Sequence, residues 1–157
     1  MANPKDFGPY SVKNVKTFKG MEGCGGFNCT VYNGKKKIAV AIDDDSGGPV
    51  NIQYVDGVDG WKNNPERKAI EAFAKSRDNS GFEVVEGFIS EMVNTVLHER
   101  WLKRQCSKNT LFRLTSDKKE NYRVVKSPYC KAVHDFLIKK YGETLIELYD
   151  AKGTRII

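Results

Sequence analysis

Hydrophobic and polar residues alternate through the first third of the chain, as expected for β-strands with one face toward a core. The alternation is clearest in 27–32 and 36–43. Asn33-Gly34 lies between these segments and favours a tight hairpin, because both residue types tolerate positive φ. Segments 11–18 and 50–55 are shorter or less regular, and the broken alternation in 11–18 indicates a bulge or an irregular edge. We therefore expect three or four antiparallel strands in meander order.

The period then changes to steps of three and four residues, which is typical of amphipathic helices. The first helix is predicted over 65–77, with Asn64 as its N-cap and Pro65 as its first residue. The second is predicted over 83–106 and is the longest. Its expected buried stripe comprises Val85, Phe88, Ile89, Met92, Val93, Val96, Leu97 and Trp101.

The last third of the chain contains both strand-like segments with a two-residue period and a helix-like segment with steps of three and four. Segments 110–115 and 121–126 predict a β-hairpin, 129–141 a helix ending at Gly142, and 145–149 a strand. The helix is expected to turn Val133, Phe136, Leu137 and Tyr141 inward. The whole pattern predicts one α+β domain over 1–157. It has an antiparallel N-terminal β meander packed with a long amphipathic helix, followed by a β-hairpin, a helix and a short C-terminal strand.

Composition places the chain among globular proteins. It has 157 residues, of which 39% are hydrophobic and 29% are charged, which argues against disorder. No apolar run approaches the roughly 18 residues of a membrane span. Residues 1–10 lack the apolar core of a signal peptide. We therefore expect a cytoplasmic protein with no membrane contact, and four reduced cysteines rather than disulfides.

The net charge of +6 is unevenly distributed. Segment 100–140 holds twelve Lys and Arg against three Asp and Glu, whereas the remainder holds fourteen basic and seventeen acidic residues. The positive charge therefore belongs to one segment. Such a concentration indicates an anionic partner more strongly than the same charge spread evenly.

The basic segment is the first candidate binding surface. Its cations recur along one side of a predicted helix, and Trp101 and Tyr122 are close in sequence. Basic side chains beside a stacking aromatic suit nucleic acid. The alternative is a solvated helix face with Trp101 in the core. The residues assigned to an anionic partner are Arg100, Trp101, Lys103, Arg104, Lys108, Arg123 and Lys126.

A glycine-rich loop at 20–26 is the second candidate. Such loops cradle phosphates when a helix follows, but here the continuation reads as a strand, so a turn or bulge is the alternative. The acidic run 43–45 offers oxygens for a divalent cation or is a solvated strand end. The candidate ligand-loop residues are Gly23, Gly25, Gly26, Asp43 and Asp45.

No metal or cofactor is predicted. The nearest candidates for a zinc site are His98, Cys106, Cys130 and His134. His98 and Cys106 would lie roughly 12 Å apart along one helix, so a four-ligand site would need a broken helix. The sequence also has no Gly-x-Ser-x-Gly motif and only two histidines. The absence of a catalytic constellation favours a binding protein over an enzyme.

Two stretches carry a resemblance. They are VKTFKGMEG at 15–23, leading to Phe27-Asn28, and YRVVK at 122–126 with KKYG at 139–142. Both resemble small, uncharacterised accessory proteins encoded by tailed bacteriophages, over about half the chain. The resemblance carries no functional residues. It implies expression in an infected bacterial cytoplasm and binding to host machinery or defence systems.

Three functional hypotheses follow. The leading one is a phage-type accessory protein that binds a host protein or complex, as in inhibition of a host defence system. The second is direct nucleic-acid binding through 100–126. The third is a small nucleotide-binding protein or enzyme that uses the glycine loop.

Overall fold

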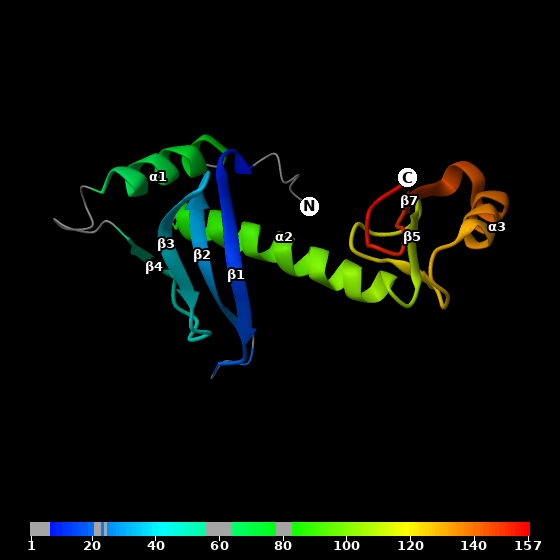
Figure 1. Ribbon diagram of the computed structural model, residues 1–157, viewed down its shortest axis with the longest axis horizontal. Helices are drawn as coiled ribbons and strands as arrows, with labels where there is room; N and C mark the ends of the chain where they lie inside the picture. Colours follow the sequence, from blue (N-terminus) through cyan, green and yellow to red (C-terminus); the bar gives the residue numbers. More distant parts are fainter. Residues whose placement is uncertain (1–6, 21–22, 24, 56–63, 78–82) are drawn as a thin grey trace. The chain divides into compact units, whose positions relative to one another are not determined.

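The computed structural model describes residues 7–20, 23, 25–55, 64–77 and 83–157 (Figure 1). The chain divides into two compact units, Met1–Val96 and Leu97–Ile157. Helix α2 (Val84–Cys106) contributes its first half to the first unit and its second half to the second. A single domain over 1–157 stays a prediction.

The first unit contains the predicted antiparallel meander. Its strands are β1 (Tyr10–Phe18), β2 (Gly26–Asn33), β3 (Lys36–Asp43) and β4 (Asn51–Tyr54), paired in the order β1-β2-β3-β4. The β2–β3 hairpin is confirmed, but its turn lies one residue later than predicted. Asn33 stays in β2 and pairs with Lys36, and the positive φ of 60° falls on Gly34.

Strand β1 carries the irregularity that its broken alternation predicted. Its register on β2 shifts between Lys13 and Lys16, and Asn14 has a φ of 54°. This bulge inserts an extra residue, so Val15 turns to the core side, where it is 4% exposed. Residues beyond the bulge then resume their alternation.

Two helices cover one face of this sheet. Helix α1 (Pro65–Arg77) begins as predicted, because the Asn64 Oδ1 accepts hydrogen bonds from the backbone N–H groups of Glu66 and Arg67, at 2.9 and 3.3 Å. The Phe88 ring of α2 packs against Phe73 of α1, with centroids 5.6 Å apart. Both helices therefore share one aromatic core with the sheet.

Phe88 also contacts the rings of Phe7 and Tyr10, each at 5.8 Å. The Arg77 guanidinium lies 5.0 Å from the rings of Phe7 and Phe88, and it donates hydrogen bonds to both carboxylate oxygens of Glu91. Cation–π contact and the bidentate ion pair together connect the end of α1 to α2.

The second unit contains the predicted hairpin, helix and final strand. Strands β5 (Thr110–Leu114), β6 (Arg123–Val125) and β7 (Leu145–Leu148) form an antiparallel sheet in the order β6-β5-β7. Helix α3 (Lys131–Tyr141) and the short 3-10 turn η3 (Gly142–Thr144) connect β6 to β7. All five residues of β5 are buried, because this strand is central and both its faces are covered.

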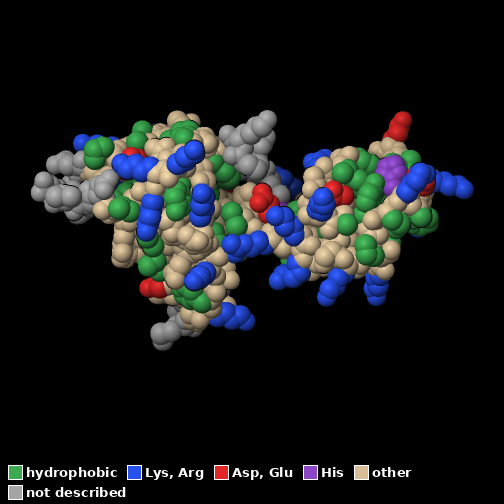
Figure 2. All heavy atoms as spheres, in the orientation of Figure 1, with side chains coloured by type: hydrophobic (Ala, Val, Ile, Leu, Met, Phe, Trp, Pro, Cys, Tyr) green, Lys and Arg blue, Asp and Glu red, His purple; other side chains and the backbone are tan. Residues whose placement is uncertain are grey.

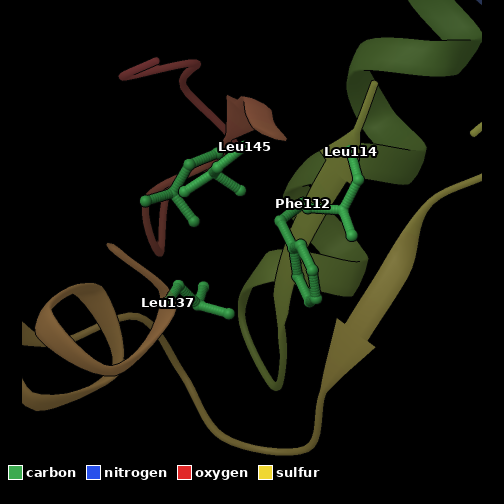
Figure 3. Packing of buried hydrophobic residues seen from close by; sticks show 5 residues of the cluster. Phe112, Leu114, Leu137 and Leu145 are labelled. Carbon is green, nitrogen blue, oxygen red and sulfur yellow. The ribbon is translucent and has the colours of Figure 1, made fainter. Parts of the chain in front are cut away.

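The core of the second unit has one cluster on each face of β5. Leu137 of α3 packs with Phe112, Leu114 and Leu145 on one face (Figure 3). The cluster on the other face contains Leu102 and Cys106 of α2 with Leu111 and Tyr149. In α2 the predicted stripe from Val85 to Val93 is buried as expected, whereas Trp101 is half-buried and the residue beside it, Leu102, is in the core.

The predicted burial of Phe136 is wrong. Phe136 is 53% exposed, whereas Leu137 is fully buried. The buried line of α3 consists of residues four apart, Val133, Leu137 and Tyr141. Phe136 lies about 100° around the helix from Leu137, which places its ring outside the core.

Replacing Gly87 with Ala should stabilise the protein. Gly87 lies in α2, and a methyl group there would meet no atom within 4 Å among the described residues. Alanine loses less backbone entropy than glycine on entering a helix, so the free energy of unfolding should rise by about 0.5–1 kcal/mol. Urea denaturation followed by circular dichroism measures this change.

Gly26→Ala is the matched control with the opposite sign. A Cβ at Gly26 would collide with the Asp43 carbonyl oxygen and the Phe18 ring, so this variant should unfold at lower urea. Equal midpoints for the two alanine variants would contradict the packing described here.

Candidate nucleic-acid interface

The positive charge of the protein lies in its second unit. Residues 97–157 hold fourteen Lys and Arg against seven Asp and Glu, whereas residues 1–96 hold twelve against thirteen. Figure 2 shows Lys and Arg side chains projecting from the surface of this unit. The uneven charge that the sequence indicated therefore coincides with a structural unit.

Most of the predicted basic residues are exposed at the end of α2. Arg100, Lys103 and Arg104 lie on its solvent side, and Lys108 lies in the turn that follows. Residues three and four apart share one helix face, so these cations form a continuous surface. Within the described part of the chain, Lys103, Arg104 and Lys108 make no ion pair, which leaves their charges available to a ligand.

Lys126 and Arg123 lie on or next to β6, but they differ in their contacts. Lys126 is exposed directly after the strand. Arg123 donates hydrogen bonds to both carboxylate oxygens of Asp117, each at 2.9 Å. Asp117 also accepts the Leu114 backbone N–H at 2.9 Å. Hydrogen bonds from Arg123 and Leu114 lower the pKa of the Asp117 carboxyl. The Arg123 guanidinium is therefore already paired within the hairpin turn, unlike the exposed Lys126.

Trp101 belongs to an aromatic cluster rather than to an open stacking surface. Its ring stacks on His98 at 5.7 Å and tilts against Tyr122 at 5.5 Å. Tyr122 in turn meets the edge of Tyr149 at 5.8 Å. Trp101 and Tyr122 are half-buried and pack against the cluster of Leu102 and its neighbours. The two aromatics that the sequence placed beside the basic residues are therefore partly used inside the fold.

His98 is the titratable member of this cluster. Its Nε2 lies 3.2 Å from the Tyr122 hydroxyl oxygen, within hydrogen-bond distance. Burial lowers the pKa of His98 from the usual 6.5, against smaller opposing effects of Glu120 and other carboxylates. The neutral imidazole is therefore favoured in the folded state.

The glycine loop and the acidic run pack against each other. Asp45 is 4% exposed with a φ of 60°, and its carboxylate accepts the Gly20 backbone N–H at 2.8 Å. The Asp45 N–H donates to the Asp43 carboxylate at 2.9 Å. A Cβ at Gly20 would collide with the Asp44 carbonyl oxygen. This close approach supports the turn interpretation of these glycines.

The remaining loop residues do not complete a ligand site in the described part of the chain. Gly23 and Gly25 are exposed, and Met21, Glu22 and Cys24 lie outside the described residues. A phosphate at Gly20 would face the Asp45 carboxylate, which already occupies the Gly20 N–H. The structure brings Gly26, Asp43 and Asp45 together, but as partners of one another and of Gly20.

Among the described residues, no group of three or more His, Cys, Asp or Glu side chains could hold a metal ion. Cys29, Cys106 and Cys130 are free thiols. Burial raises the pKa of the Cys29 thiol to about 11 and that of Cys106 above its usual value. No described helix has the length and apolar composition to cross a membrane.

A cleft in the first unit could not be predicted from the sequence. This cleft has a volume of about 450 Å³ and lies between β4, α1 and the start of α2. Glu71 in its wall forms an ion pair with Lys75 at 2.8 Å, and burial raises the pKa of Tyr54 to about 12. These residues come from three segments and look like ordinary surface positions in sequence. Its lining comprises Ile52, Tyr54, Arg67, Glu71, Lys75, Glu83, Val84, Val85 and Glu86.

No protein-family model, curated protein or solved structure matches this chain. A fold by itself does not specify an activity, so the evidence for function lies in the chemistry of the surfaces.

Acid should destabilise the second unit through His98. Because the folded-state pKa of His98 lies below the unfolded value of 6.5, the unfolded chain binds the proton first as the pH falls. The stabilisation is complete above pH 6.5 and is lost as the pH falls toward the folded-state pKa. Urea midpoints followed by Trp fluorescence should fall in this window.

The variant His98→Phe keeps an aromatic ring at this position but does not titrate, so its midpoint should fall less over the same pH range. His134→Gln is the control, because His134 is outside the cluster of His98, Trp101 and Tyr122, so the midpoint of this variant should fall as much as that of the wild type. An unchanged pH dependence in His98→Phe would exclude His98 as the cause.

Proposed function

We propose that the chain is a nucleic-acid-binding module and that the end of α2 provides a contact surface for phosphates. The surface comprises Arg100, Lys103, Arg104 and Lys108, and is called the α2 basic surface below. The observation that carries the proposal is the excess of cations in the second unit, with several of them exposed together on one helix face.

The position of these cations suits phosphate contacts. Leu102 and Cys106 anchor the same helix turns in the core, where they are 5% and 0% exposed. The backbone of Lys103 and Arg104 is thereby held on a rigid element, while their side chains extend into solvent. Because the backbone of this surface is already ordered, binding costs little backbone conformational entropy.

The contacts favour recognition of the backbone rather than of base sequence. Lys and Arg side chains neutralise phosphates and release counterions, which is independent of sequence. Trp101 and Tyr122, the aromatics that could read or stack bases here, are half-buried against His98 and Tyr149. We therefore expect little sequence preference from the α2 basic surface.

Neutralising three cations of this surface should weaken duplex binding. In the variant Lys103→Gln, Arg104→Gln, Lys108→Gln, three phosphate contacts are lost. The slope of log affinity against log salt concentration should therefore become shallower by about 2.7, or about 0.9 for each contact with duplex DNA. Fluorescence anisotropy with a labelled duplex, repeated over a salt series, measures this slope.

The matched control makes the same charge change at three exposed lysines on other elements: Lys68→Gln and Lys75→Gln on α1, and Lys139→Gln on α3. Its salt slope should stay close to that of the wild type. Equal slopes for the two triple variants would show that the α2 basic surface does not contact phosphates.

A protein partner is the second candidate, and one observation favours it. Phe136 is 53% exposed on α3, and the Lys140 ammonium lies 5.4 Å from the centre of its ring. Exposed aromatic side chains often carry much of the binding energy at protein interfaces. An aromatic residue beside a cation suits an acidic protein surface. That the partner is a host protein, as in the phage-type accessory role, stays a prediction.

If a protein binds at α3, Phe136→Gln should abolish its capture while leaving nucleic-acid affinity unchanged. Ile138→Gln is the matched control, because Ile138 is 41% exposed but lies about 200° around the helix from Phe136. Affinity purification from nuclease-treated bacterial lysate compares the two variants with the wild type. Proteins captured equally by both variants would exclude Phe136 as the contact.

A further inference from the structure

The sheet of the first unit has one face that α1 and α2 cover and one that they do not. On the covered face, Tyr10 of β1 contacts Phe73 of α1 at 5.3 Å and Phe88 of α2 at 5.8 Å. Successive residues of a strand point to opposite faces. Residues one step along from this core set therefore form the other face, called the outer sheet face below.

Strand register places three lysines on the outer sheet face. Lys13 pairs with Thr30, next to the inward pair Val12 and Val31. The β1 bulge then brings Lys16 to the same side as Lys13, opposite Asn28. A second register shift pairs Lys37 of β3 with Tyr32 of β2. The two register shifts thus leave Lys13, Lys16 and Lys37 on the same face of the sheet.

The outer sheet face carries positive charge without compensation from its own residues. Lys13, Lys16 and Lys37 are all exposed. Among the described strand residues that the register assigns to this face, none is Asp or Glu. By contrast, Lys36 on the covered side forms an ion pair with Glu66 of α1 at 3.3 Å. In the view of Figure 2, Lys and Arg side chains lie over this sheet.

Aromatic rings lie among these lysines. The Lys13 ammonium is 4.7 Å from the centre of the Tyr32 ring. Phe18 is 38% exposed, and its ring lies over Gly26, where a side chain would leave it no room. Because Phe18 pairs with Gly26, and Tyr32 follows Gly26 by six residues, the two rings mark a track of roughly 20 Å along the strands.

We propose that the outer sheet face binds single-stranded nucleic acid, with phosphates at Lys13, Lys16 and Lys37 and bases against Tyr32 and Phe18. Charge complementarity selects a polyanion. The rings select a single strand, because its base faces can stack on aromatic side chains whereas a duplex buries them. This surface shares no residue with the α2 basic surface, so the two proposals can fail separately.

The test uses the full chain carrying Lys103→Gln, Arg104→Gln and Lys108→Gln, which weakens the α2 basic surface. Into this background we place Lys13→Gln with Lys16→Gln, or the control pair Lys68→Gln with Lys75→Gln. The four residues are exposed, and both pairs remove the same charge. Fluorescence anisotropy with labelled oligothymidylate and oligouridylate, over a salt series, measures affinity.

The Lys13 and Lys16 pair should weaken binding more than the control pair. Its salt slope should become shallower by about 1.4, or about 0.7 for each phosphate contact with a single strand. Equal affinities and slopes for the two pairs would overturn the proposal. The proposal would also be overturned if the background variant showed no measurable binding to either oligonucleotide. That result would favour a protein as the partner of this face.

Tyr32→Leu tests the aromatic contact separately. Leucine keeps the half-buried apolar contact but removes the ring, so single-strand affinity should fall about tenfold, with duplex affinity unchanged. Circular dichroism confirms that the variant is folded. An equal loss for single strand and duplex, or no loss, would contradict base stacking. A stronger effect on oligouridylate than on oligothymidylate would support RNA as the ligand, and the reverse would support DNA.

Discussion

The packing of Phe88 against Phe7, Tyr10 and Phe73 is the contact on which the first unit depends. It joins α2 to β1 and α1, and it decides which face of the sheet becomes the core. Once Tyr10 is inside, the two-residue period of the strands and the β1 bulge place Lys13 outside. The chemistry of the outer sheet face is therefore a consequence of aromatic packing on the opposite side.

In the second unit, the packing around β5 likewise decides which side chains of α2 are exposed. Both faces of that strand are covered by hydrophobic clusters. The cluster on one face contains Leu102 and Cys106 of α2. Their burial leaves Lys103 and Arg104 on the solvent side of the same helix turns. Exposed charges contribute little to stability, and these cations make no ion pair within the described residues. Their concentration is thus more readily explained by a ligand than by folding.

Most elements could be predicted because they depend on local signals. Asn64 caps α1 as its residue type favours, and the β2–β3 hairpin follows from Gly34 between two alternating segments. The error at Phe136 arose because a helix of apolar and basic residues has two plausible inward faces, and only packing against β5 selects Leu137. The outer sheet face was missed for a similar reason, since its lysines are distant in sequence and meet only through strand pairing.

The proposed binding of nucleic acid depends on lysines that the core leaves exposed. Amide chemical-shift mapping by NMR, during titration of the wild-type chain with a short single-stranded oligonucleotide, tests it most directly. We expect the shifts to concentrate on β1 and β2 around Lys13, Lys16 and Tyr32, with a second set at Lys103–Lys108. Shifts confined to the glycine loop or to the cleft around Tyr54, or no shifts at saturating oligonucleotide, would contradict it.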